Sequence, residues 1–162
     1  MRTLVFHLTM LSDQLQDGKM ERGTAQALQL APALRAELET WMRAGYPNET
    51  CGLLLGRREG ATGKVARVRQ ARNVVAARAR DRFELDPADF LAADTEARQL
   101  GEEIVGIWHS HPDHPATPSE TDRAAAWPGW CYVIASVGRN GVTDWRCWRL
   151  NGDEFAEEVI ES

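Results

Sequence analysis

The chain has 162 residues, of which 43% are hydrophobic and 27% are charged, and its formal net charge is -5. This length and composition predict one globular domain with a single core, and they exclude a largely disordered chain. The negative net charge argues against a general affinity for nucleic acid or for acidic membrane surfaces.

The cysteines and the apolar segments favour a cytoplasmic protein. Cys51, Cys131 and Cys147 show no CxxC spacing and leave one thiol unpaired in any scheme, although one disulfide stays open. All three lie in apolar segments, where we expect them to act as small buried hydrophobes. No apolar run reaches the roughly 20 residues of a membrane span, and residues 4–11 are not followed by a signal-peptide cleavage site.

Residues 1–27 do not continue the pattern of the rest of the chain, and we assign them to an N-terminal extension. Three interpretations of this extension are possible: a frayed arm, an edge element of the sheet, or an extension from an upstream start codon. The last arises because Met20 could also be the start of translation. The folded domain is then expected to comprise residues 28–162.

The first half of this domain is predicted to hold a helix and a hairpin. Apolar residues recur at helical spacing between Pro32 and Gly45, and residues 51–55 and 64–70 have strand character. Residues 73–82 are predicted to form an exposed loop rich in Ala and Arg. Such a loop is either a docking place for a partner or a solvated run of charge.

A second helix is predicted to begin at Asp86, because Asp is a favourable N-cap and Pro87 suits the first helical position. Its buried face is expected to consist of Phe90, Leu91, Ala97 and Leu100. Strands are then expected at residues 104–108, 131–137 and 143–150, with an edge strand at residues 155–160. Because strands and helices interleave, the predicted architecture is a mixed α/β sheet flanked by helices.

Two histidines follow the predicted strand at residues 104–108. His109 and His111 are one residue apart, so on an extended backbone both rings project to the same side and can meet one ion. Two imidazoles and one carboxylate leave the fourth zinc position open, as in catalytic zinc sites. Asp122 is the predicted third ligand, since the loop before it can return its carboxylate to the histidines.

Several residues in and around this group also have an interpretation that needs no metal. Ser119 and Asp122 have the spacing of a capping box, in which the two side chains cap the start of a short helix. His114 lies in an exposed loop and is expected to be a surface residue instead of an additional ligand. Trp108 and Trp127 flank the site segments, and packing in the core is the favoured role for both over shaping a pocket.

The whole constellation resembles the signature of the JAMM (MPN+) zinc metalloprotease family. That signature is an upstream Glu, then HxHP, six residues, and SxxD, and every spacing from His109 to Asp122 agrees with it. The resemblance covers about residue 30 to the end, including Tyr46–Glu49 and Gly106–Pro112. Thr50 departs from many bacterial relatives, which carry a second cysteine there, but it touches none of the assigned roles.

This resemblance implies the fold and the roles of the site residues. It implies one JAMM/MPN domain with a mixed, curved sheet similar to that of cytidine deaminases, and one Zn²⁺ held by His109, His111 and Asp122. Glu49 would act as general base and acid, and the Ser119 hydroxyl would stabilise the oxyanion.

The resemblance also implies an activity and a partner. The expected reaction is hydrolysis of the amide or isopeptide bond after the C-terminal Gly-Gly of a small ubiquitin-like or sulfur-carrier protein of the ThiS or MoaD type. The alternative is a non-catalytic scaffold, which the complete set of ligands argues against. A zinc deaminase would need H-x-E and P-C-x-x-C motifs, and the chain has neither. The oligomeric state is not predicted.

Overall fold

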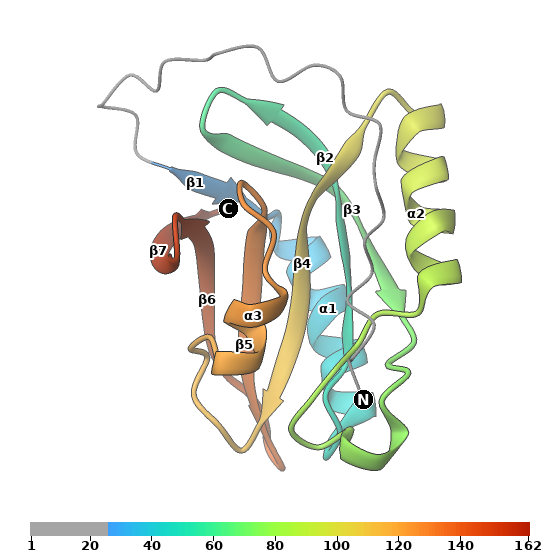
Figure 1. The fold of residues 1–162 in the computed structure, drawn as a ribbon, viewed down its shortest axis with the longest axis vertical. Helices are drawn as coiled ribbons and strands as arrows, with labels where there is room; N and C mark the ends of the chain where they lie inside the picture. Colours follow the sequence, from blue (N-terminus) through green and yellow to red (C-terminus); the bar gives the residue numbers. More distant parts are fainter. Residues whose placement is uncertain (1–25) are drawn as a thin grey trace.

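Seven strands form a closed barrel in the computed structural model, which describes residues 26–162 (Figure 1). The strands are β1 (Ala27–Gln29), β2 (Cys51–Glu59), β3 (Thr62–Ala71), β4 (Glu103–Pro112), β5 (Cys131–Gly138), β6 (Gly141–Asn151) and β7 (Glu154–Glu161). The helices are α1 (Pro32–Gly45), α2 (Pro87–Gln99) and α3 (Glu120–Ala125), with a single 3-10 turn, η1, at Ala76–Arg78. The mixed α/β architecture predicted from the sequence is confirmed.

The strand order is β1-β3-β2-β4-β5-β6-β7, and β1 closes the barrel by pairing in parallel with both β3 and β7. The expectation of an edge strand at residues 155–160 is therefore wrong, because β7 has a partner on each side. β1 is only three residues long and was not predicted. It begins at Ala27, the last residue of the predicted extension; residues 1–25 lie outside the described part of the chain.

Two apolar clusters cover the two faces of the sheet. One includes Leu38 and Met42 of α1 together with Leu54 and Trp108, and the other includes Ala97 of α2. Successive side chains of a strand point to opposite faces of the sheet, so neighbouring residues belong to different clusters. Figure 1 shows α1 behind the sheet, whereas α3 lies in front of it, over β5. None of the described helices is long and apolar enough to cross a membrane.

The predicted buried face of α2 is wrong in part. Leu91 and Leu100 are 63% and 45% exposed, whereas Ala93 and Ala97 are buried. The predicted roles of Phe90 and Ala97 are confirmed, since Phe90 packs against the apolar cluster that includes Ala97, whereas the two leucines face solvent. The predicted start is confirmed, since the Asp86 carboxylate accepts hydrogen bonds from the first backbone amides of the helix.

The hairpin of β2 and β3 is longer than predicted, because β2 continues past Leu55 to Glu59. A close contact near its start requires glycine: a Cβ at Gly52 would lie 1.9 Å from the carbonyl oxygen of Arg69. The indole Nε1 of Trp108 donates a hydrogen bond to the same oxygen at 3.1 Å. Gly52 thus lets β2, β3 and β4 approach each other just beside the histidine segment.

Candidate metal centre

The C-terminal end of β4 presents two imidazoles on one face of the sheet. His109 and His111 lie inside the strand, which continues to Pro112 and pairs in parallel with β5 over its whole second half. Their Nε2 atoms are 3.0 Å apart, as expected for residues i and i+2 of a strand. His109 is fully buried and His111 nearly so.

The short helix α3 brings a carboxylate to the same point. Asp122 Oδ1 lies 3.2 Å from His109 Nε2, and Asp122 Oδ2 lies 3.5 Å from His111 Nε2. The three side chains form a buried group of potential metal ligands. The structure therefore brings together the three residues that the sequence predicted as ligands.

These distances fit a tetrahedral zinc ion. Nitrogen and oxygen ligands at roughly 2.0–2.1 Å from zinc are separated from one another by roughly 3.3 Å, and the three distances observed lie around this value. His111 Nδ1 is 2.8 Å from the carbonyl oxygen of Pro115. An Nδ1–H that donates to this carbonyl leaves the Nε2 lone pair free for a metal, which is a common arrangement for histidine ligands.

His109 is oriented by packing instead of by a second hydrogen bond. Its ring stacks on Phe83 with the centroids 4.4 Å apart, and its Nδ1 atom is buried without a hydrogen-bond partner in the described part of the chain. Phe83 precedes α2, and no motif in the sequence connects it with the site. Aromatic stacking of this kind restricts the rotation of the imidazole.

Two of the three groups favour the forms that bind metals, and His111 differs from them. Burial lowers the pKa of His111, but its bonds with Asp122 and the Pro115 carbonyl outweigh burial, and its pKa is raised. Burial lowers the pKa of His109, so its imidazole is neutral. Burial alone would raise the pKa of Asp122, but hydrogen bonds with the two histidines and Ser119 outweigh it and hold the pKa of this carboxyl well below its usual range. Neutral imidazole and ionised carboxylate are the forms that coordinate zinc.

Ser119 caps α3 in the way that the alternative reading predicted. Its backbone amide donates to Asp122 Oδ2 at 2.6 Å, and the backbone amide of Asp122 donates to its hydroxyl at 3.1 Å, which completes a capping box. The Ser119 hydroxyl also donates to Asp122 Oδ2 at 2.7 Å. The cap also fixes the orientation of the Asp122 carboxylate. Ser119 itself is exposed at the rim of the group, so its hydroxyl is open to solvent as well.

Glu49 lies in the loop between α1 and β2 and is only 8% exposed. Its backbone amide donates to the carbonyl oxygen of Ala79, and its carbonyl oxygen accepts from the Asn73 side chain at 3.3 Å. Burial is the main cause that raises the pKa of Glu49 to about 7, while His111 lowers it and Asp122 raises it. The carboxyl group is thus close enough to the candidate ligands to respond to their charges.

This raised pKa predicts a pH-dependent stability for the zinc-free protein. A carboxyl whose pKa is about 7 when folded and 4.5 when unfolded stabilises the fold below pH 4.5, and this contribution is lost as the pH rises through 7. The loss amounts to roughly 3 kcal/mol. In chelator-treated protein, we expect Glu49→Gln to be more stable than wild type at pH 8 but not at pH 4.5, as measured by urea unfolding. If the variant and wild type differed equally in free energy of unfolding at both pH values, the raised pKa of Glu49 would be contradicted.

Thr50 connects the Glu49 loop to the histidine strand. Its amide donates to Ser110 Oγ at 2.9 Å, its hydroxyl lies 3.1 Å from the same oxygen, and the Ser110 amide donates to the Thr50 carbonyl at 2.9 Å. Ser110 stands between the two histidines, so these bonds fix the loop relative to both rings. No role was predicted for Thr50, because its contact with Ser110 joins segments that are 60 residues apart in the chain.

A second connection joins Tyr46 to Asp113. The phenol donates to both carboxylate oxygens of Asp113, at 3.0 and 3.2 Å. Asp113 directly follows Pro112 and has a positive φ of 57°, which is uncommon for a residue other than glycine. The bond therefore ties the end of β4 to the segment that leads to Glu49.

We expect Tyr46→Phe to lower kcat about tenfold, with little change in zinc content, because a hydrogen bond to a charged group that positions Glu49 is lost. Steady-state kinetics and metal analysis of the purified variant measure both effects. If Tyr46 acts through Asp113, Asp113→Asn should add little to the Tyr46→Phe defect. Fully additive losses in the double variant would show that the two residues act separately.

The other residues singled out in the sequence lie apart from the three ligands. His114 is exposed and does not belong to the group of potential ligands, as expected. Trp108 is fully buried and stacks on Trp41, so its expected core role is confirmed. Trp127 is 43% exposed, and the expectation that it packs in the core is wrong, because it stacks on Trp130 near the surface.

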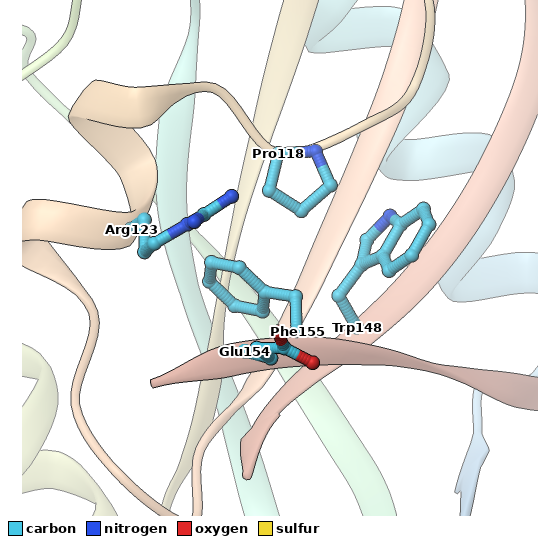
Figure 2. Close-up of a pocket in the computed structure, with 5 residues that line it drawn as sticks. All are labelled: Pro118, Arg123, Trp148, Glu154 and Phe155. Atoms are coloured by element: carbon cyan, nitrogen blue, oxygen red, sulfur yellow. The ribbon is translucent and has the colours of Figure 1, made fainter. Parts of the chain in front are cut away.

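A pocket of about 260 Å³ borders the loop that leads to Ser119. It is lined by Pro118, Arg123, Trp148, Glu154 and Phe155. Figure 2 shows Arg123 reaching from α3 toward Pro118 and the Phe155 ring, with the Trp148 indole on the other side. The Trp148 indole also donates to the carbonyl oxygen of Ala116 at 3.0 Å, which holds this loop against β6.

The barrel with its histidine strand and acidic helix defines the class to which the chain belongs. Residues 31–151 match the family described as prokaryotic homologs of the JAB domain, and the chain is a member of this family. The JAMM resemblance seen in the sequence is thereby confirmed.

Individual relatives agree with this assignment. The chain is 36% identical over 140 residues to a desampylase of Haloferax volcanii, with 83% of this chain and 95% of the relative covered. It is 33% identical to a desampylase of Pyrococcus furiosus, with 68% and 73% covered. Among solved structures, a protein from Desulfitobacterium hafniense has a TM-score of 0.74 at 32% identity, with 83% of this chain and 94% of that one covered. These matches support a hydrolase of the JAMM type.

Proposed function

We propose that this protein is a zinc-dependent isopeptidase that hydrolyses the amide bond after the C-terminal Gly-Gly of a small ubiquitin-like or sulfur-carrier protein. The observation that carries the proposal is the convergence of two imidazole Nε2 atoms and one carboxylate within 3.0–3.5 Å. The loop bonded to Ser110, between the two histidines, carries the buried Glu49. The desampylase relatives support an activity of this kind.

His109, His111 and Asp122 would hold the zinc ion. When bound, zinc lowers the pKa of a water ligand and polarises a carbonyl oxygen, which is the chemistry that amide hydrolysis requires. Three protein ligands leave a coordination position for the reaction, as in other catalytic zinc sites.

Glu49 would transfer the protons. Its carboxylate is expected to accept a proton from the attacking water and to donate a proton to the leaving amine, for which a pKa near neutrality is favourable. Its burial is the main cause of this raised pKa. The backbone bonds of the Glu49 loop to Ala79 and Asn73 hold it in place without engaging its carboxylate.

Ser119 would stabilise the developing negative charge on the carbonyl oxygen with its hydroxyl. The same hydroxyl donates to Asp122 Oδ2, so it would have to turn from the carboxylate toward the substrate. As the N-cap of α3, Ser119 also anchors the start of this helix, whichever way its hydroxyl proton points. A capping serine at the rim of the group is compatible with both tasks.

The loop of residues 73–82 is the proposed contact for the carrier protein. Arg78 pairs with Asp81, and Arg72 just before the loop pairs with Asp86 and Asp89. Among the described ion pairs, Arg80 and Arg82 do not take part. These two guanidinium groups are therefore the ones available to an acidic partner surface.

A direct test uses a sulfur-carrier protein that ends in Gly-Gly, linked through an isopeptide bond to a lysine peptide. We expect mass spectrometry to show a new carrier C-terminus after the second glycine, with cleavage that depends on added zinc. The matched control replaces Gly-Gly by Ala-Ala, which should resist cleavage if the groove accepts only glycine. Binding of the carrier without any cleavage would favour the alternative, a non-catalytic scaffold.

A further inference from the structure

A second group of potential metal ligands lies on the other face of the sheet. Cys131 on β5, Cys147 on β6 and Glu158 on β7 are all buried, and their ligand atoms lie within 4.8 Å of one another. Cys131 pairs with Gly106, three residues before His109 on β4. Cys131 and Cys147 pack in the apolar cluster of α1, whereas the histidines face α3, so the two groups are separate.

The distances within this group suit thiolate coordination. Glu158 Oε2 lies 3.8 Å from Cys131 Sγ and 4.0 Å from Cys147 Sγ. A sulfur ligand at about 2.3 Å and an oxygen ligand at roughly 2.0–2.2 Å from a tetrahedral zinc ion are separated by roughly 3.5 Å, so the two sulfur–oxygen distances observed are slightly longer than in a metal-bound site. Gly63 on β3 faces Cys131, where a Cβ would lie 3.5 Å from its sulfur, so no side chain from β3 enters this space.

A disulfide does not account for the two thiols. Cys131 pairs with Arg149, and Cys147 pairs with Val133, so the cysteines are diagonal neighbours on adjacent antiparallel strands. The Cα atoms of such neighbours are about 7–8 Å apart, which is at or beyond the limit of about 7 Å for a disulfide. An ion between the sulfurs spans this separation without movement of the backbone.

Arg149 supplies the charge that a buried site of this kind needs. Its guanidinium pairs with Glu158 and donates to Cys131 Sγ at 3.1 Å, and its other donors reach the carbonyl oxygens of Gly129 and Ala61. A structural role as a buried ion pair would be enough to explain the contacts of Arg149 with Glu158. It does not explain why two thiols converge on the same carboxylate.

We propose that Cys131, Cys147 and Glu158 form a second metal site, which takes a thiophilic divalent cation such as Zn²⁺. On binding, each thiol forms a sulfur–metal bond and releases one proton to solvent. The two thiolates and the carboxylate are then balanced by the divalent ion and by the guanidinium of Arg149, so the buried group stays neutral overall. With three protein ligands, the fourth position is left to a water molecule. The site would join three consecutive strands of the barrel.

Cobalt titration of a variant without the first centre tests this proposal. In reduced His109→Ala/His111→Ala protein, we expect one Co²⁺ per chain with an intense near-ultraviolet band from charge transfer between thiolate and cobalt. The band should vanish in Cys131→Ala/Cys147→Ala, whereas Cys51→Ala, which removes a buried thiol elsewhere, should keep it. A folded variant that binds no cobalt, or a band that requires Cys51 instead, would overturn the proposal.

A second measurement covers the case in which the cysteine variants do not fold. Wild-type protein loaded with ¹¹³Cd should give two cadmium resonances, one of them shifted far downfield by sulfur ligands. A single resonance in the range of nitrogen and oxygen ligands would overturn the proposal. The cobalt band and the downfield cadmium resonance are independent of peptidase activity and of the first centre, so a failure of the proposed function would leave both unchanged.

Discussion

We expect His109→Ala to lose one zinc ion per chain relative to wild type and to lower the rate of cleavage by at least about a thousandfold. Zinc contributes several kcal/mol to stabilisation of the transition state, and a site with only His111 and Asp122 binds it weakly. Metal analysis after desalting measures the zinc content, and a carrier–peptide conjugate measures the rate. A ligand that binds only the folded state raises the melting temperature. Because His109→Ala removes this centre, the part of the zinc-dependent rise in melting temperature that comes from it should disappear.

His114→Ala is the matched control for this variant. His114 is exposed and lies outside the ligand group, although it is only five positions further along the chain. Its replacement should leave zinc content and rate unchanged. Loss of zinc in His114→Ala, or full activity in His109→Ala, would contradict the assignment of ligands.

Glu49→Gln is expected to keep its zinc but to lose cleavage by a factor on the order of 10³–10⁴. Glutamine has nearly the same shape as glutamate but accepts no proton, and general acid–base catalysis is typically worth 10²–10⁴ in rate. Because Glu49 is not one of the three ligands, metal content should equal that of wild type. Single-turnover kinetics with saturating enzyme separates this chemical step from substrate binding.

Glu84→Gln provides a control for the removal of a negative charge nearby. Glu84 is exposed at the end of the loop that packs over Glu49, and its backbone amide is bonded to the Asn73 side chain. This variant should retain the wild-type rate. Loss of zinc together with activity in Glu49→Gln would show instead that Glu49 supports the metal group structurally.

The local elements of this fold were predictable because their signals lie within a few residues. The Asp86–Pro87 start of α2, the end of α1 at Gly45 and the turn between β5 and β6 all appear where the sequence indicates. The closure of the barrel was not predictable, because β1 has only three residues and its partners are the distant strands β3 and β7. A pairing of that kind has no local periodicity that reveals it.

The candidate metal centre was predictable for a similar reason. His109 and His111 share a strand, so their spacing alone puts both rings on one face. The supporting contacts are different: Tyr46 with Asp113 and Thr50 with Ser110 join segments that are 60 or more residues apart. Such pairs depend on the register of β2 against β4, which becomes visible only in three dimensions.

A crystal structure of zinc-loaded protein, with anomalous diffraction data at the zinc edge, tests the proposed metal centre most directly. We expect a strong anomalous peak within bonding distance of His109 Nε2, His111 Nε2 and the Asp122 carboxylate, with the Glu49 carboxylate facing the remaining coordination position. The absence of a peak among these three side chains, or a Glu49 carboxylate directed away from it, would show that the proposed centre is wrong.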